Sequence, residues 1–306
     1  MNMAPSQPFA PSSSAPAGPS LDDLIRHSQL PRAEARRLLA YLTGQPLTWF
    51  MAHGDDPADP DIATRFQALA ERRRAGEPLA YLLGQQEFYG RPFAVSPAVL
   101  IPRADTETLV ETALEQLARL RRQRCAVPLS LLELGTGSGI IAITLALEAP
   151  DTEVHAVERS PEALANATDS HEATENTATA AQTTSPITAR QERPTEPPAR
   201  RFDLIVSNPP YIAANDHHLQ QGDLRFEPPQ ALAAGPDGLD DLRIIIGGAP
   251  SHLNPGGWLL LEHGYDQETP VQALLRDAGF ADVFTRRDLA GQPRVSGGRW
   301  LGDGRK

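Results

Sequence analysis

The stretch LLELGTGSGIIA, residues 131–142, decides the fold of this chain. It reads as a short apolar strand, a glycine-rich turn and the start of a helix, the place where α/β sheets bind nucleotides. A dinucleotide fingerprint needs its third glycine where this chain has Ile140, and a phosphate-binding loop needs a Gly-Lys-Ser/Thr sequence that this stretch lacks. A purely structural turn is the alternative. The loop favours a close backbone approach to a bulky ligand without a pyrophosphate, and its candidate binding residues are Gly135, Thr136, Gly137, Ser138 and Gly139.

A second signal is Glu158, which follows the next strand-like run. An acid at this place accepts hydrogen bonds from both hydroxyls of a ribose, as it does in dinucleotide-binding folds. Apolar runs alternate with helical patterns as far as residue 278, which predicts a largely parallel sheet covered by helices on both faces. The last two runs have no helix between them and predict a closing antiparallel pair. The predicted strands are 129–134, 152–157, 202–207, 258–262, 283–287 and 294–300.

The segment NPPY, residues 208–211, follows the apolar run FDLIVS and points to a planar nitrogen as the reacting group. Its two prolines fix φ at about −65° and remove two N–H donors, so the carbonyls here are left as free acceptors. Asn208 and the carbonyl of Pro209 can accept both hydrogens of a substrate –NH₂ group, while Tyr211 offers an aromatic wall and a polar tip. The alternative is a purely structural role, in which the segment forms a tight turn after a strand.

These signals are predicted to meet in one cleft, because ligands of such sheets bind beyond the carboxyl ends of the strands. Gly135, Glu158 and Asn208 each follow a predicted strand. Glu262 and His263 end a further strand-like run, where they can either line the cleft or hold the strand end.

Taken together, these stretches resemble class I S-adenosylmethionine-dependent methyltransferases of the HemK/PrmC type, the peptide chain release factor glutamine methyltransferase family. The resemblance runs from about Leu21 to Leu301 and includes LIPRADTE, residues 100–107, in which Ala104 replaces the family's usual proline. Further matching stretches are FEP (226–228), GLD (238–240) and LLLEHG (259–264).

The resemblance implies an α/β, Rossmann-like domain with a mostly parallel sheet and a C-terminal antiparallel pair, preceded by a small all-α domain. It implies S-adenosyl-L-methionine as cofactor and the glutamine in the Gly-Gly-Gln loop of peptide chain release factors as substrate. The cofactor would be held by the loop 135–139, Glu158 and Asn208. Catalysis would fall to Asn208, Pro209 and Tyr211, and substrate binding to Asn208, Pro209, Pro210 and Tyr211.

One region fits the family poorly. Residues 169–200 are rich in Ala, Thr, Glu and Pro where an apolar strand is expected, and about 169–190 reads as a low-complexity insert. The family places an acid near the adenine ring at the end of its third strand. We therefore align residues 186–192 as a weak third strand and Glu192 as the adenine-side acid, with a solvated charge in an insert as the alternative.

Composition agrees with a two-part enzyme of 306 residues and 40% hydrophobic content. We expect a disordered tail at 1–20, an N-terminal helical substrate-recognition domain at 21–85, a hairpin-like connector at 86–101 and the methyltransferase domain at 102–306. A single cysteine favours a reducing compartment, hence the cytoplasm, and no run of 18 apolar residues predicts a membrane span. A monomer is expected.

The net charge of −11 argues against a nucleic-acid substrate, because proteins that hold polyanions normally display a basic stripe. An exocyclic-amine methyltransferase for DNA or RNA stays the main alternative, since such enzymes also use Asn-Pro-Pro-Tyr loops. A glutamine methyltransferase for a ribosomal protein and a binding module without turnover are further alternatives. His217 and His218 lack metal-ligand spacing, and no metal site is predicted.

Overall fold

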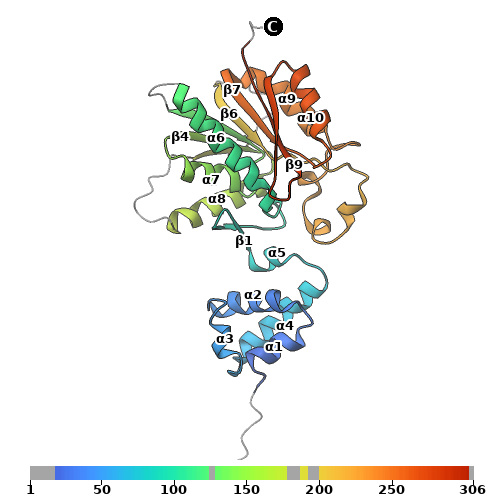
Figure 1. Cartoon of the computed structure of the whole chain (residues 1–306). Coiled ribbons are helices and arrows are strands. Elements are labelled where there is room, and N and C mark those ends of the chain that lie inside the picture. The colour runs from blue at the N-terminus through green and yellow to red at the C-terminus, as the bar shows by residue number, and fades with distance from the viewer. Residues whose placement is uncertain (1–17, 124–127, 178–186, 192–199, 303–306) are drawn as a thin grey trace, which may run out of the picture. The chain divides into compact units, whose positions relative to one another are not determined.

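The computed structural model describes residues 18–123, 128–177, 187–191 and 200–302, and divides the chain into two units, Met1–Leu83 and Gly84–Lys306 (Figure 1). Within these described ranges, no helix is long and apolar enough to cross a membrane. The stretch expected as a connector, 86–101, falls in the second unit.

The first unit is helical. Its helices pack their apolar faces around one core that includes Leu38, Phe50 and Phe66. The periodic apolar residues of the sequence are the ones that this core buries. The helices are α1 (Leu21–His27), α2 (Arg32–Thr43), α3 (Phe50–His53), α4 (Pro60–Arg74) and α5 (Leu79–Leu83).

The start of this unit corrects the expected tail. Ser20 caps α1 through a capping box, in which its hydroxyl accepts from the Asp23 N–H and the Asp23 carboxylate accepts from the Ser20 N–H, each over 3.1 Å. The Pro19 carbonyl accepts from the Ala58 N–H over 2.9 Å. Residues 19 and 20 therefore belong to the folded unit, and only residues 1–17 of the expected tail lie outside the described residues.

The second unit contains a seven-stranded sheet in the order β5-β4-β3-β6-β7-β9-β8. The first five of these strands are parallel, and β9 pairs antiparallel with both β7 and β8. The α/β class with a closing antiparallel pair is thereby confirmed. The strands are β3 (Leu129–Leu134), β4 (Thr152–Glu158), β5 (Ile187–Gln191), β6 (Phe202–Ser207), β7 (Leu253–Glu262), β8 (Ala281–Arg287) and β9 (Pro293–Arg299).

Helices cover both faces of this sheet (Figure 1). Alternate residues of β3 face opposite sides, so that Leu131 joins a core with α6 and α7, whereas Leu132 joins a second core with α9 and α10. The helices are α6 (Glu107–Gln123), α7 (Ile140–Glu148), α8 (Pro161–Thr177), α9 (Asp240–His252) and α10 (Glu268–Asp277).

Short elements complete the second unit. A hairpin of β1 (Gln85–Phe88) and β2 (Arg91–Ala94) turns at Tyr89 and Gly90, both with positive φ, and buries Phe88 and Phe93 in the core beside α6. The short helical turn η1 (Ala104–Thr106) leads into α6. Three more turns, η2 (His217–Gln220), η3 (Leu224–Phe226) and η4 (Pro229–Ala231), lie between β6 and α9.

The structure alters the expected insert at 169–190. Helix α8 continues to Thr177, beyond the end near 168 that the sequence pattern predicts, and β5 pairs in parallel with β4 within the residues aligned as a weak third strand. The added residues 169–177 have the polar sequence DSHEATENT, and composition alone does not separate a helix of such residues from a loop. Residues 178–186 and 192–199, with Glu192, lie outside the described residues.

Candidate active site

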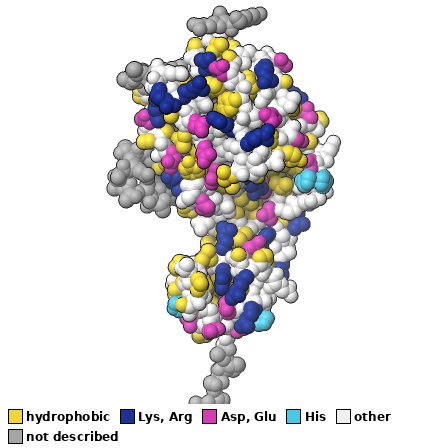
Figure 2. Space-filling model, in the orientation of Figure 1, with side chains coloured by type: hydrophobic (Ala, Val, Ile, Leu, Met, Phe, Trp, Pro, Cys, Tyr) yellow, Lys and Arg dark blue, Asp and Glu magenta, His cyan; other side chains and the backbone are white. Residues whose placement is uncertain are grey.

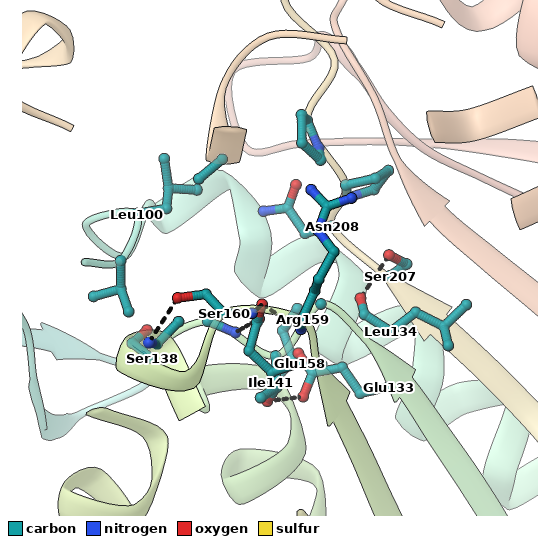
Figure 3. A pocket seen from close by; sticks show the side chains of 18 of the residues that line it. Leu100, Glu133, Leu134, Ser138, Ile141, Glu158, Arg159, Ser160, Ser207 and Asn208 are labelled. Carbon is teal, nitrogen blue, oxygen red and sulfur yellow. Dashed lines mark hydrogen bonds between the residues drawn. The ribbon is translucent and has the colours of Figure 1, made fainter. Parts of the chain in front are cut away.

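A cavity of about 320 Å³ lies at the carboxyl ends of β3, β4 and β6. Its lining includes residues 135–138 of the glycine loop, Glu158, Asn208, Pro209 and Pro210, whereas Gly139 does not line it (Figure 3). Further parts of the wall come from residues 98–100, 102, 103 and 106, from residues 159, 160 and 163, from the segment around Pro228 and from the start of α9. The three sequence-distant signals therefore meet in one cleft, as the crevice rule predicts.

The glycine loop has a backbone that only glycine adopts easily. Gly135, Gly137 and Gly139 have φ values of 71°, 54° and 83°. A Cβ added at Gly139 would approach Ile143 Cδ1 to 2.8 Å, whereas one at Gly135 or Gly137 would meet no protein atom within 4 Å. The first two glycines therefore leave open space beside the loop, and the third allows close packing at the start of α7.

A buried carboxyl supports this loop from beneath. Glu133 is fully buried, and its Oε2 accepts from the Thr136 hydroxyl over 2.6 Å and from the Ala142 N–H over 3.0 Å. Its Oε1 is buried and has no hydrogen-bond partner among the residues that the structure describes. Burial raises the pKa of Glu133 to about 8. Its role was not predicted, although a charged residue inside the apolar run LLELG is a signal that could have revealed it.

Glu158 ties the second strand end to the glycine loop. Its Oε2 accepts from the Gly137 N–H over 2.9 Å, and its Oε1 accepts from the backbone N–H groups of Arg159 and Ser160 over 2.7 and 3.0 Å. A carboxylate has about four acceptor positions, so Glu158 can still accept from a ligand hydroxyl.

Asn208 lies on the cavity wall directly after β6. Its Nδ2 donates to the Thr106 hydroxyl over 3.2 Å. The preceding Ser207 donates to the Leu134 carbonyl over 2.8 Å, which fixes the end of β6 beside the end of β3. Pro209 is buried and Pro210 half-buried, and both line the same cavity.

Tyr211 does not lie on the cavity wall, contrary to the expected substrate-facing ring. Its ring packs against the core beneath α9 and α10, and its hydroxyl donates to Glu262 Oε1 over 3.2 Å. Its carbonyl accepts from the Gln267 side chain over 2.9 Å. The direction of an aromatic side chain after a loop depends on distant packing partners, so the segment NPPY alone could not fix it.

Glu262 and His263 form the buried end of β7. Glu262 is 1% exposed, and burial raises its pKa to about 7. His263 is fully buried between the Gly264 carbonyl and the Ser296 hydroxyl, each 2.8 Å from one ring nitrogen, and burial lowers its pKa. Neither residue lines the cavity. Of the two roles expected for His263, lining the cleft or holding the strand end, the structure supports the second.

A buried acid joins two walls of the cavity. Glu227 Oε2 accepts from the Ile101 N–H over 3.0 Å, and its Oε1 pairs with the Arg103 guanidinium. Arg103 and the neighbouring Pro228 both line the cavity. The stretches LIPRADTE and FEP, separate in the sequence, thus form one part of the wall.

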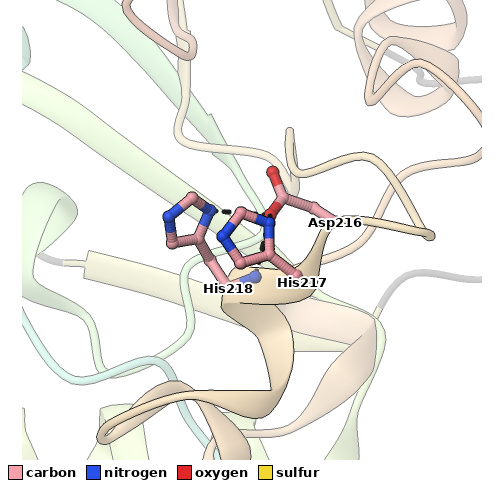
Figure 4. Close-up of side chains that lie close together, drawn as sticks. All are labelled: Asp216, His217 and His218. Carbon is pink, nitrogen blue, oxygen red and sulfur yellow. Dashed lines mark hydrogen bonds and ion pairs between the residues drawn. The ribbon is translucent and has the colours of Figure 1, made fainter.

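Asp216, His217 and His218 lie close together outside the cavity (Figure 4). Their potential ligand atoms fall within 4.8 Å of one another, although the sequence spacing did not suggest a metal site. Asp216 Oδ1 already accepts from the His218 N–H over 2.8 Å and contacts the His218 ring over 2.7 Å, and both histidines are exposed. This arrangement caps the turn η2.

The fold and the site together define a class I methyltransferase. A family model described as methyltransferase small domain matches residues 113–225, and one described as PrmC N-terminal domain matches residues 23–84. The hMettl16 catalytic domain, solved in complex with MAT2A 3'UTR hairpin 1, has a TM-score of 0.51 at 16% identity over 87% of this chain and 92% of that chain, a likeness of fold alone.

Curated relatives narrow the class to one family. The release factor glutamine methyltransferase of Bordetella pertussis is 49% identical over 91% of this chain and 98% of its own length. The protein of the same name from Salmonella typhimurium is 46% identical over 90% of this chain and 95% of its own length. This chain therefore belongs to the release factor glutamine methyltransferase family.

Proposed function

We propose that this protein transfers a methyl group from S-adenosyl-L-methionine to the side-chain amide nitrogen of the glutamine in the Gly-Gly-Gln loop of peptide chain release factors. The observation that carries the proposal is the position of Asn208, an acceptor-bearing side chain on the wall of the cavity that the glycine loop borders. The family membership of the chain supports the substrate class. The cytoplasmic location and the monomeric state stay predictions.

The residues of the cavity fit this cofactor. The open space beside Gly135 and Gly137 allows a bulky ligand to lie against the loop backbone. Glu158 borders the same cavity with acceptor capacity for a ribose, and its carboxylate is held in place by three backbone N–H groups. When bound, the cofactor supplies an electrophilic methyl group on a sulfonium.

The protein must position and activate the reacting nitrogen. An amide nitrogen is a weak nucleophile, because its lone pair is delocalised into the carbonyl. The Asn208 Oδ1 and the Pro209 carbonyl would accept both of its hydrogens, hold it in the cavity and aim its lone pair at the methyl group. Both acceptors gain strength as the nitrogen becomes positive, so they stabilise the transition state more than the ground state. The proton then leaves readily, and no side chain is assigned as a strong base.

Mass spectrometry of a release factor tests the proposal. The purified protein is incubated with the release factor and the cofactor, and the peptide that contains Gly-Gly-Gln is sequenced. We expect one added methyl group on the glutamine side chain. If a ribosomal protein is methylated and the release factor is not, the proposed substrate is wrong. If only a nucleic acid is methylated, the proposal of protein methylation is wrong.

The distribution of charge bears on the nucleic-acid alternative. Figure 2 shows basic side chains interspersed with acidic ones on the face in view, and the whole chain carries a net charge of −11. A nucleic-acid enzyme draws most of its affinity from clustered positive charge.

A further inference from the structure

The proposed role of Asn208 depends on which way its amide points. An asparagine can present either its oxygen or its NH₂ group to a ligand. Only the oxygen accepts a hydrogen from a substrate amide. In the structure, the Nδ2 atom donates to the Thr106 hydroxyl over 3.2 Å, and no described residue donates to the oxygen. Thr106 therefore decides the orientation of the amide.

The Thr106 hydroxyl is itself held by its surroundings. Thr106 is fully buried in η1, and its oxygen accepts from Asn208. It lines the same cavity as Asn208. Burial keeps the hydroxyl from turning toward water, so its contact with Asn208 is maintained.

We propose that Thr106 is a positioning residue for Asn208. Its hydroxyl holds the NH₂ group of Asn208, and the amide oxygen is thereby presented to the nitrogen that is methylated. This inference rests on the proposed function. It also gives a physical task to the stretch LIPRADTE, which supplies Thr106.

Substitutions at Thr106 test the inference. Thr106→Val keeps the shape but lets the amide turn, and we expect kcat for release-factor methylation to fall ~10-fold or more, the rate equivalent of one lost polar contact in a desolvated site. The Kd for the cofactor, measured by calorimetry, should stay within about twofold. Thr106→Ser restores the hydroxyl and should recover most of kcat.

Thr112→Val is the matched control. Thr112 is 3% exposed in α6, and its hydroxyl donates over 2.6 Å to the Thr108 carbonyl of its own helix. It should leave kcat unchanged. A Thr106→Val enzyme with the kcat of the Thr112→Val enzyme would overturn the inference.

A second measurement separates this inference from the proposed function. The side-chain NH₂ group of Asn208 gives an NMR signal that can be assigned by its loss in Asn208→Asp. We expect that signal to shift in Thr106→Val and to keep its position in Thr112→Val. An unchanged signal in Thr106→Val overturns the positioning role whatever the enzyme methylates, whereas a shifted signal in a protein that leaves the release factor unmethylated contradicts only the proposed function.

Discussion

Two buried carboxyl groups near the reaction site are kept from ionising freely by the fold. Burial raises the pKa of Glu133 to about 8 and that of Glu262 to about 7, both from an ordinary value of 4.5. A carboxyl whose pKa is higher in the folded state binds its proton more tightly there. The stability this provides is complete below about pH 4.5, falls as the unfolded chain ionises, and is lost once the pH passes the folded-state pKa.

The variant Glu133→Gln should change how stability depends on pH. Glutamine can still accept from Thr136 and Ala142, but it carries no charge to bury. We expect similar unfolding free energies for the variant and the wild type near pH 5, and a variant more stable by on the order of a few kcal/mol near pH 9. Denaturant unfolding at the two pH values measures the difference. If the difference in unfolding free energy between variant and wild type does not grow with pH, Glu133 ionises as easily in the folded protein as in the unfolded chain.

At the scale of elements, the glycine loop and its neighbouring strand ends form the ligand-binding edge of the sheet. The positive φ of Gly137 and the open space beside it leave the backbone exposed to the cavity. Any side chain at this position strains the loop and occupies that space.

Gly137→Val should abolish cofactor binding while most of the fold persists. The matched control is Gly291→Val, because Gly291 also has a positive φ and open space around it but does not line the cavity. Both variants should lose similar stability from backbone strain, on the order of 1 kcal/mol or somewhat more. Calorimetric titration with S-adenosyl-L-methionine distinguishes them: only the first should fail to bind. Wild-type affinity in Gly137→Val would show that the cofactor lies elsewhere.

The elements that local patterns could predict are those whose signal is carried by consecutive residues. The run at 129–134 and the run at 202–207 coincide with β3 and β6 because buried parallel strands are continuously apolar. The site contacts with long sequence separation could not be predicted this way. Thr106 meets Asn208, and Glu262 meets Tyr211, only after the sheet has assembled. The end of α8 was misjudged because its last residues are polar, which suits a solvated helix and a loop equally well.

At the scale of the whole molecule, every residue that lines the cavity belongs to the unit Gly84–Lys306. The unit Met1–Leu83 has its own buried core. We therefore expect the chemistry in the second unit, and recognition of the protein substrate stays the predicted task of the first.

Removal of residues 1–83 tests this division of labour. We expect the truncated protein to bind the cofactor with an affinity within a few-fold of the full chain, while kcat/KM for the release factor falls by at least ~10-fold through a higher KM. Circular dichroism confirms that the truncated protein is folded before the comparison. Full activity of the truncated protein would contradict a recognition role for the helical unit.

The most direct test of the account is the methylation rate of a release factor by Asn208→Ala at saturating cofactor. The alanine removes the acceptor that strengthens as the nitrogen becomes positive, so kcat should fall by roughly 10² to 10³-fold, by analogy with the loss of an oxyanion-hole donor. Asn208→Asp keeps an acceptor of similar size and should retain more activity than Asn208→Ala. An Asn208→Ala enzyme that binds cofactor normally and keeps the full kcat would contradict the assignment of this side chain to the reacting amide.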